Sequence, residues 1–244
     1  MPGLRKSQDT WERILESAET LFARQGYSGT STRQIAAAAG VSIQTLQYHC
    51  GGKKNLYRAV LERTVVPVTD LINRYVQKML EQDLTDERVL EESVARIIDE
   101  LFDLLQAKPH YAPLFYRQWL VLDPDLRNVE WENLIPLLRN WAEKIEAQLG
   151  EERLRGTNLF LMNWSMSWIF WGLFVQPSFL ARYMGIDPDS PEFLRTLKDH
   201  AWEMTLRMMG QRRSSSPSPF GKKKARARKK TATGQKKIPT GKKK

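Results

Sequence analysis

The sequence predicts an all-α protein in three parts: an N-terminal helix-turn-helix domain over residues 8–66, a larger helical domain over 67–210, and a disordered tail over 211–244. Three observations predict this division. Apolar residues recur every three or four positions through the first two parts, which is the helical period. No stretch alternates β-branched and polar residues between turn signals, as a strand would. From Gln211 onward the chain is low in complexity and charged in one sign, which is typical of disorder.

The first two helices are predicted over residues 8–25 and 32–39. The first would bury one apolar face and end at Gly26, a residue that favours helix ends. That face consists of Ile14, Leu15, Ala18, Leu21 and Phe22. The second would begin with a capping box, in which the Ser31 hydroxyl and the Gln34 side chain each bond the other residue's backbone N–H. Arg5 and Lys6 are expected to precede the first helix.

A third helix is predicted over 43–50 and a fourth over about 53–80. Gly40 would end the second helix and Ser42 would cap the third, which leaves a three-residue turn containing glycine, as in a helix-turn-helix. Leu46 would anchor the third helix to the core, and its polar residues would face outward. The alternative is a small helical subdomain whose polar face has no partner.

The larger domain is predicted to contain five helices, over residues 86–106, 109–119, 127–149, 157–176 and 190–210. The fourth of these is apolar enough to be mistaken for a membrane span. Asn163, Ser165 and Ser167 interrupt it, however, and no basic flank supports insertion. A buried helix is therefore the better prediction, and no membrane partner is expected.

Charge is distributed very unevenly along the chain. Residues 1–63 carry a net charge of +4, residues 64–210 carry −8, and the tail carries +14 from ten Lys and four Arg. An acidic body repels a polyanion, so nucleic acid is expected to meet the two ends. The start MPGLRKSQDT has no signal-like character and the chain has one cysteine, which predicts a reducing cytoplasm. Cys50 is expected to be a small buried hydrophobe.

The third helix has the side chains that read DNA in the major groove. Gln44 and Gln47 can hold adenine, and Arg33 can hold guanine, while methyl groups of Ile43 and Thr45 suit thymine. The hydroxyl, imidazole and ammonium groups nearby suit phosphates. The predicted DNA contacts are Ser31, Thr32, Arg33, Ser42, Ile43, Gln44, Thr45, Gln47, Tyr48, His49 and Lys53. Arg5 and Lys6 either follow the DNA backbone or minor groove, or are simply solvated.

The last predicted helix carries an apolar seam with spacing 3, 4, 3 and 4, which suits a partner helix. It consists of Leu194, Leu197, Ala201, Met204 and Met208. We expect this seam to form a homodimer interface, although packing within one chain has the same spacing. Phe160, Trp164, Trp168 and Trp171 are stepped along the preceding helix and would share that interface or a pocket.

Aromatic residues are concentrated in the larger domain, where seven of the eight Trp lie between residues 119 and 202. Such an interior can hold a small hydrophobic or aromatic effector. The predicted pocket residues are Tyr111, Phe115, Tyr116, Trp119, Asn163, Trp164 and Trp168, and Arg117 and Gln118 are further polar candidates. The alternative is that each Trp is simply part of the core.

Residues 8–60 resemble the N-terminal domain of the tetracycline-repressor (TetR) family. The resemblance is carried by Arg13-Ile14-Leu15, Ala18, Leu21-Phe22, Gly26-Tyr27, Ile35-Ala36, Ala39-Gly40-Val41-Ser42, Thr45-Leu46, Tyr48-His49, Lys53 and Leu56. It implies a homodimeric bacterial transcriptional regulator, usually a repressor, that binds a palindromic operator and is released by a small molecule. It also implies a dimer interface formed by the last two helices of the body.

Three positions depart from the family pattern. Gln47 stands where an aromatic residue is common, Cys50 replaces a packing Phe or Tyr, and Gly52 replaces a capping Ser or Asn. Glycine is an acceptable cap, whereas Cys for Phe removes core volume. These departures bear on the operator sequence more than on the activity.

Two other classes of function are an enzyme and an architectural DNA-binding protein. The three histidines form no catalytic or metal-ligand spacing and no phosphate loop is present, so we predict no enzyme, no cofactor and no metal. The second rival is an architectural, nucleoid-type DNA-binding protein that depends on its Lys-rich tail and has no effector. The predicted location is the bacterial cytoplasm, on the nucleoid when DNA is bound.

Overall fold

The computed structural model describes residues 2–120, 124–154, 157–210 and 219–220, and every regular element in these ranges is a helix. The side chains of residues 2–6, 119 and 124–134 lie outside this description. The elements are α1 (Pro2–Gly29), α2 (Thr32–Ala39), α3 (Ile43–Cys50), α4 (Lys53–Leu80), α5 (Glu87–Ala107), α6 (Tyr111–Trp119), α7 (Pro124–Leu154), α8 (Leu159–Val175), α9 (Pro177–Met184) and α10 (Pro191–Met208). The all-α prediction is confirmed. The predicted disorder of residues 211–244 falls almost wholly outside the described residues.

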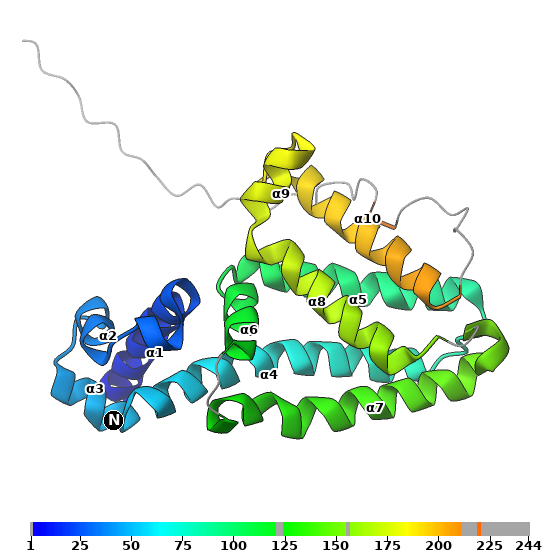
Figure 1. Ribbon diagram of the computed structural model, residues 1–244. Coiled ribbons are helices and arrows are strands. Elements are labelled where there is room, and N and C mark those ends of the chain that lie inside the picture. The colour runs from blue at the N-terminus through cyan, green and yellow to red at the C-terminus, as the bar shows by residue number, and fades with distance from the viewer. Residues whose placement is uncertain (1, 121–123, 155–156, 211–218, 221–244) are drawn as a thin grey trace, which may run out of the picture.

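The buried side chains form two separate hydrophobic cores, and α4 contributes to both. Its first half supplies Leu56, Tyr57, Val60 and Leu61 to a core with α1, α2 and α3. Its second half supplies Val68, Leu71, Val76 and Met79 to the core of α5–α10. Figure 1 shows α1–α3 gathered at one end of the molecule, with α4 running from them along the body. The small domain is thus held on the body by a continuous helix.

Helix positions agree with the sequence prediction, with two corrections. α1 begins at Pro2 rather than at residue 8, so Arg5 and Lys6 lie within the helix instead of preceding it. α9 was not predicted: its eight residues show too little period, and, unlike the equally short α2 and α3, it has no side-chain cap at its start. Its end signals were present, however: Pro177 occupies the first turn, and Gly185 caps the end with φ 68°, as helix ends favour.

α1 and α7 each consist of two helices joined at a kink, and a glycine lies at each kink. Gly26 in α1 has φ 74° and ψ 175°, and Gly150 in α7 has φ 75° and ψ 158°. A residue with a side chain is strained at such positive φ values. The break at Gly26 falls at the predicted end of the first helix, and a short turn follows it to Gly29.

α8 is apolar around its whole circumference, but it is only partly covered. Leu159, Met166, Trp171 and Phe174 are buried, whereas Leu161 is 58% exposed. The prediction of a buried helix therefore holds for one side. Among the described residues, no helix has the length and apolar character needed to cross a bilayer. A helix apolar all round that leaves one side in water indicates a surface for a partner.

Pro67 interrupts the hydrogen bonding of α4 between the two cores. Proline has no N–H, so the carbonyl four residues earlier, that of Arg63, loses its helical donor. The Tyr111 hydroxyl of α6 donates to this carbonyl at 3.3 Å. Burial, followed by the nearby Glu19 carboxylate, raises the pKa of the Tyr111 hydroxyl above its ordinary value. α6 therefore supplies the bond that Pro67 removes.

Tyr111→Phe is expected to lower the free energy of unfolding by about 1–3 kcal/mol, since the Arg63 carbonyl is left without a donor. Urea denaturation would measure the loss. Pro67→Ala restores a backbone donor, so Tyr111→Phe should cost clearly less in that background. An equal cost in both backgrounds would show that the Tyr111–Arg63 bond does not compensate for the proline.

Candidate nucleic-acid interface and effector cavity

Both helices of the helix-turn-helix, α2 and α3, have capping residues at their ends. The Ser31 hydroxyl accepts from the Gln34 backbone N–H at 3.2 Å, and the Gln34 Oε1 accepts from the Ser31 backbone N–H at 2.7 Å, so the predicted capping box is present. Gly40 ends α2 with φ 64°. The Ser42 hydroxyl then accepts from the Thr45 backbone N–H at 3.0 Å and starts α3. Each cap satisfies a backbone group that a short helix leaves unpaired.

α3 divides into a buried side and an outward side. Leu46 is fully buried and Cys50 is 7% exposed, as the sequence predicted for both. Ile43, Gln44, Gln47 and Tyr48 form one exposed surface, on which Tyr48 is 85% exposed. The Gln47 Nε2 donates to the Gly51 carbonyl at 3.0 Å. Gln47 therefore has a local bond that it must give up, or share, to hold a base.

Side chains flanking this surface are positioned by aromatic neighbours. His49 stacks on Trp11 with ring centroids 6.2 Å apart, and it meets Tyr48 edge-on. Lys53 lies over the ring of Tyr27 at 4.3 Å, and burial lowers the pKa of its ammonium. A cation held over an aromatic ring is partly ordered before it meets a phosphate.

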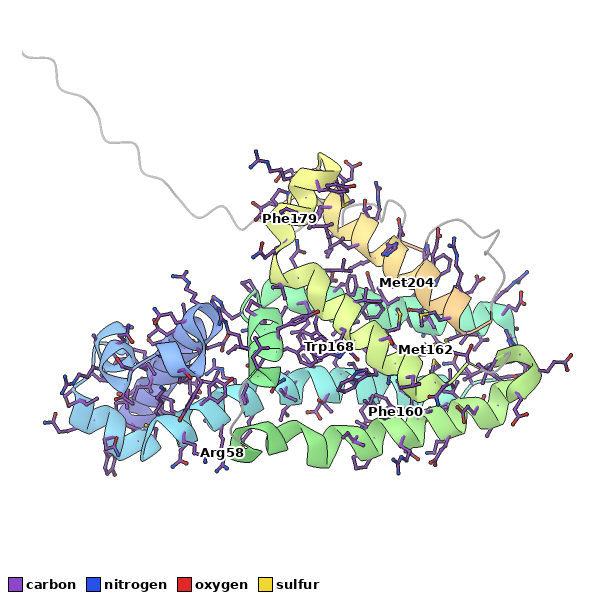
Figure 2. The ribbon with its side chains drawn as sticks, in the orientation of Figure 1. Arg58, Phe160, Met162, Trp168, Phe179 and Met204 are labelled. Atoms are coloured by element: carbon purple, nitrogen blue, oxygen red, sulfur yellow. The ribbon has the colours of Figure 1, made fainter. Side chains whose placement is uncertain are left out.

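The same region is free of negative side chains. No Asp or Glu occurs between Glu19 and Glu62, a stretch that contains Arg24, Arg33, Lys53, Lys54 and Arg58; Figure 2 marks Arg58 on α4. The three glutamates of α1 face Arg63 of α4 instead: the Arg63 Nη1 lies 2.5 Å from the Glu12 Oε2, the Nη2 3.9 Å from the Glu16 Oε1 and the Nε 3.8 Å from the Glu19 Oε2. The remaining predicted contacts Ser31 and Arg33 are exposed, and Thr32 and Thr45 are half-buried. The structure thus brings the predicted residues together on α2, α3 and the start of α4.

The body contains two adjoining cavities. The larger, of about 130 Å³, lies among α4, α5, α7, α8 and α10. The smaller, of about 60 Å³, lies among α4, α6, α7 and α8. Ile72, Leu138, Trp141 and Asn163 line both. Figure 2 labels Met162 and Trp168 on α8, which line the larger and the smaller cavity respectively.

The predicted pocket residues divide into two groups. Phe115, Asn163, Trp164 and Trp168 line one or both cavities. Tyr111 and Tyr116 are absent from both linings: Tyr111 bonds Arg63, and the Tyr116 hydroxyl donates to the Trp168 carbonyl. The side chain of Trp119 lies outside the described residues. Sequence reasoning missed the aliphatic wall on α4 and α5, including Val76 and Ile98, because such residues also fill ordinary cores.

α6 connects the cavities with the small domain, as its place in Figure 1 between α1 and α8 indicates. Phe115 stacks on Trp171 with ring centroids 4.2 Å apart, whereas its neighbour Leu114 is fully buried in the α1–α4 core. Arg117, a predicted polar pocket residue, points the other way. Its Nε donates to the Ala23 carbonyl at 2.8 Å and its Nη2 to the Arg24 carbonyl at 2.7 Å. Both carbonyls belong to the end of α1 before the Gly26 break.

The predicted seam on α10 is divided between the interior and the surface. Leu197 and Ala201 are buried in their own chain, so at these two positions intramolecular packing is the correct reading. Nearby, the Lys198 ammonium bonds Asp99 of α5 at 2.7 Å and also Asp103. These bonds fix which side of α10 faces inward. Leu194, Met204 and Met208 are half-buried and remain candidates for a partner.

Comparison with known proteins gives one family. Residues 14–60 match the family model described as bacterial regulatory proteins, tetR family. A transcriptional regulator of Shigella flexneri, AcrR, is 34% identical over 74 residues, which are 30% of this chain and 34% of that protein. The transcriptional repressor AcnR of Corynebacterium glutamicum is 29% identical over 68 residues, which are 28% and 36% of the two chains. The chain matches about a quarter to a third of its curated relatives' length.

Solved structures extend the likeness to the body. SmeT, the repressor of a Stenotrophomonas maltophilia multidrug efflux pump, aligns with a TM-score of 0.56 at 17% identity, over 82% of this chain and 91% of SmeT. A TetR-like regulator from Rhodococcus aligns with a TM-score of 0.53 at 16% identity, over 80% and 94% of the two chains. At these identities the likeness concerns the fold alone.

Proposed function

Because the chain belongs to the TetR family of bacterial regulatory proteins, we propose that it represses transcription as a homodimer on a palindromic operator and leaves DNA when a small hydrophobic effector binds. The named relatives are transcriptional regulators and none is an enzyme, in agreement with the sequence prediction. A regulator of this kind acts in the bacterial cytoplasm, on the nucleoid when DNA is bound.

The outward surface of α3 carries the DNA-binding part of this proposal. A capped helix that presents Ile43, Gln44, Gln47 and Tyr48 to solvent has the size and the groups to enter a major groove. Apolar Ile43 and Tyr48 cost free energy in water, so their exposure calls for a partner. Selecting bound fragments from a random DNA pool tests the proposal: a palindrome supports it, whereas unselective coating supports an architectural protein.

Gln47→Ala is expected to cost about 1–3 kcal/mol of binding free energy on the selected site and to relax the preference at one position per half-site. An amide in the place of an aromatic residue can hold a base edge, most simply adenine. The value should lie toward the lower end, because the wild type gives up the Gln47–Gly51 bond on binding. Titrations on the selected site and on single-base variants would measure this.

Lys53→Ala is the matched control for Gln47→Ala. It removes a phosphate partner and should weaken all sites about equally, since phosphates carry no sequence information. If Gln47→Ala also weakens all sites equally, Gln47 contacts only the backbone, and base reading falls to Arg33, Gln44 and Thr45.

The dimer part of the proposal is supported by apolar side chains left in water on three neighbouring helices. Leu161 and Ile169 of α8 are exposed, Met204 and Met208 of α10 are half-buried, and Phe179 and Tyr183 of α9 are 70% and 84% exposed. Figure 2 labels Phe179 and Met204 on these helices. Two-fold contact through α8 and α10 would cover this face and place two copies of α3 on one DNA duplex.

Replacing Leu161 and Ile169 together by Lys should convert the dimer to monomer, because like charges would be buried across a two-fold axis. Leu197 is unsuitable for this test because its own chain buries it. Sedimentation velocity measures the change, and Val66→Lys, at another exposed apolar residue on α4, should leave the dimer intact. A double variant that remains dimeric would place the interface elsewhere.

Effector control is supported by the position of α6. A ligand in the smaller cavity meets Phe115 on one side of this helix, and Leu114 and Arg117 hold α1 on the other. A shift of α6 would therefore change how the small domain sits on the body. The ligand must bind the DNA-free arrangement more tightly, or it shifts nothing.

Arg117→Met keeps an unbranched stem as far as the ε position and removes the guanidinium with both of its bonds to α1. We expect it to leave effector affinity nearly unchanged and to reduce the effector's influence on operator affinity, whose usual size is about 1–3 kcal/mol. Operator titrations with and without a compound that quenches Trp emission would measure this. Arg139→Met, at an exposed residue of α7, is the control. If the effector changes operator affinity as much in Arg117→Met as in the wild type, Arg117 does not transmit the effect of the ligand.

A further inference from the structure

The volumes of the two cavities and their shared junction indicate the size and shape of a ligand that would fill them. An apolar protein cavity of about 150 Å³ is known to bind benzene, and the larger cavity is about 130 Å³. The smaller cavity, of about 60 Å³, suits a short arm of two or three heavy atoms. The four shared residues Ile72, Leu138, Trp141 and Asn163 form the junction between them. A single ring with a short side arm fits this volume.

The lining of the two cavities determines the charge of the ligand. Among the lining residues whose side chains the structure describes, none is Asp, Glu, Lys, Arg or His, and the polar ones are Thr69, Asn163, Ser167 and Thr205. An ion buried there would lose its hydration and gain no opposite charge. A carboxylate or an ammonium is therefore excluded, and the ligand is neutral.

Trp141 adds a polar requirement at the junction. Its side chain is 3% exposed, and its indole Nε1 is a buried donor with no acceptor among the described residues. Trp202, equally buried in the same core, differs in that its Nε1 donates to the Glu91 carbonyl at 3.1 Å. Buried donors are nearly always paired in folded proteins, so this N–H, on a residue that lines both cavities, is left for a ligand atom to pair.

We propose that the effector is a neutral compound with one ring in the larger cavity, a short arm in the smaller one, and a hydrogen-bond acceptor at the junction that takes the Trp141 Nε1–H. Ketones, esters, lactones and amides have such an acceptor. The identification of this ligand with the effector rests on the proposed function, whereas the selectivity of the cavity does not.

Calorimetry with propiophenone, propylbenzene and 3-phenylpropanoate tests the chemistry on the wild-type full-length protein. The first two are nearly the same shape, but only the ketone has an acceptor. The ketone should bind at least as tightly as the hydrocarbon, although its transfer from water to an alkane is far less favourable. The carboxylate should not bind. If the protein prefers propylbenzene over propiophenone by as large a factor as an alkane solvent does, the proposed acceptor at the junction is wrong. If none of the three compounds binds, the proposed ligand class is wrong.

Trp141→Phe then identifies the donor. The affinity ratio of ketone to hydrocarbon should fall about tenfold, which corresponds to one hydrogen bond. Trp202→Phe removes an equal volume and an N–H away from the cavities, so it should leave the ratio unchanged. An unchanged ratio in Trp141→Phe would overturn the role of Trp141, and the wild-type comparison stands if the variant fails to fold.

Operator titrations with the same probes separate this inference from the proposed function. A ketone preference with no change in operator affinity would confirm the selectivity of the cavity and overturn its role as an effector site. Release of DNA by both compounds, with a preference for the hydrocarbon as large as that of an alkane solvent, would overturn the acceptor and leave effector control in place.

Discussion

The arrangement of the whole molecule depends on α6, which is packed into both hydrophobic cores at once. Leu114 is fully buried among α1–α4, and the next residue, Phe115, is stacked on Trp171 of α8. Adjacent side chains on a helix point in different directions, so one short helix can belong to two cores. Because packed interiors tolerate little free volume, neither core can rearrange near α6 without affecting the other.

Hydrogen bonds restrict α6 to one position between the cores. Arg117 ends α1 by binding two of its last carbonyls, and Tyr111 satisfies the carbonyl that Pro67 leaves without a donor in α4. A buried carbonyl without a partner costs free energy, so a movement of α6 that breaks these bonds is unfavourable at both α1 and α4. The same helix borders the smaller cavity through Phe115, and it is through this helix that the proposed effector would act on the small domain.

Sequence reasoning was most accurate where structure is local. Ser31 with Gln34, Gly40 and Ser42 are end signals that act within a few residues, so the helix-turn-helix and its outward side chains followed from spacing alone. The long helices of the body were also predicted, from the helical period of their apolar residues. α9 was missed because it has little apolar period and, unlike the equally short α2 and α3, no capping side chain at its start. The start of α1 was set too late. The apolar seam of α10 was wrong at Leu197 and Ala201, because a 3-4 pattern identifies an apolar face without identifying its partner.

The sequence by itself determined the helix class, the caps, the acid-free stretch from residue 20 to residue 61 and the residues of the α3 surface, because these depend on neighbours in the chain. Tertiary structure alone decided which aromatic residues line a cavity and which bond elsewhere. Arg117 and Tyr111 appeared in the sequence as polar residues of a pocket, and folding turned them toward α1 and α4. Trp141 was one Trp among eight, and its unpaired N–H at the junction became visible only when α4, α7 and α8 were brought together. Contacts between residues far apart in the chain depend on how whole helices pack, and no local pattern encodes that packing.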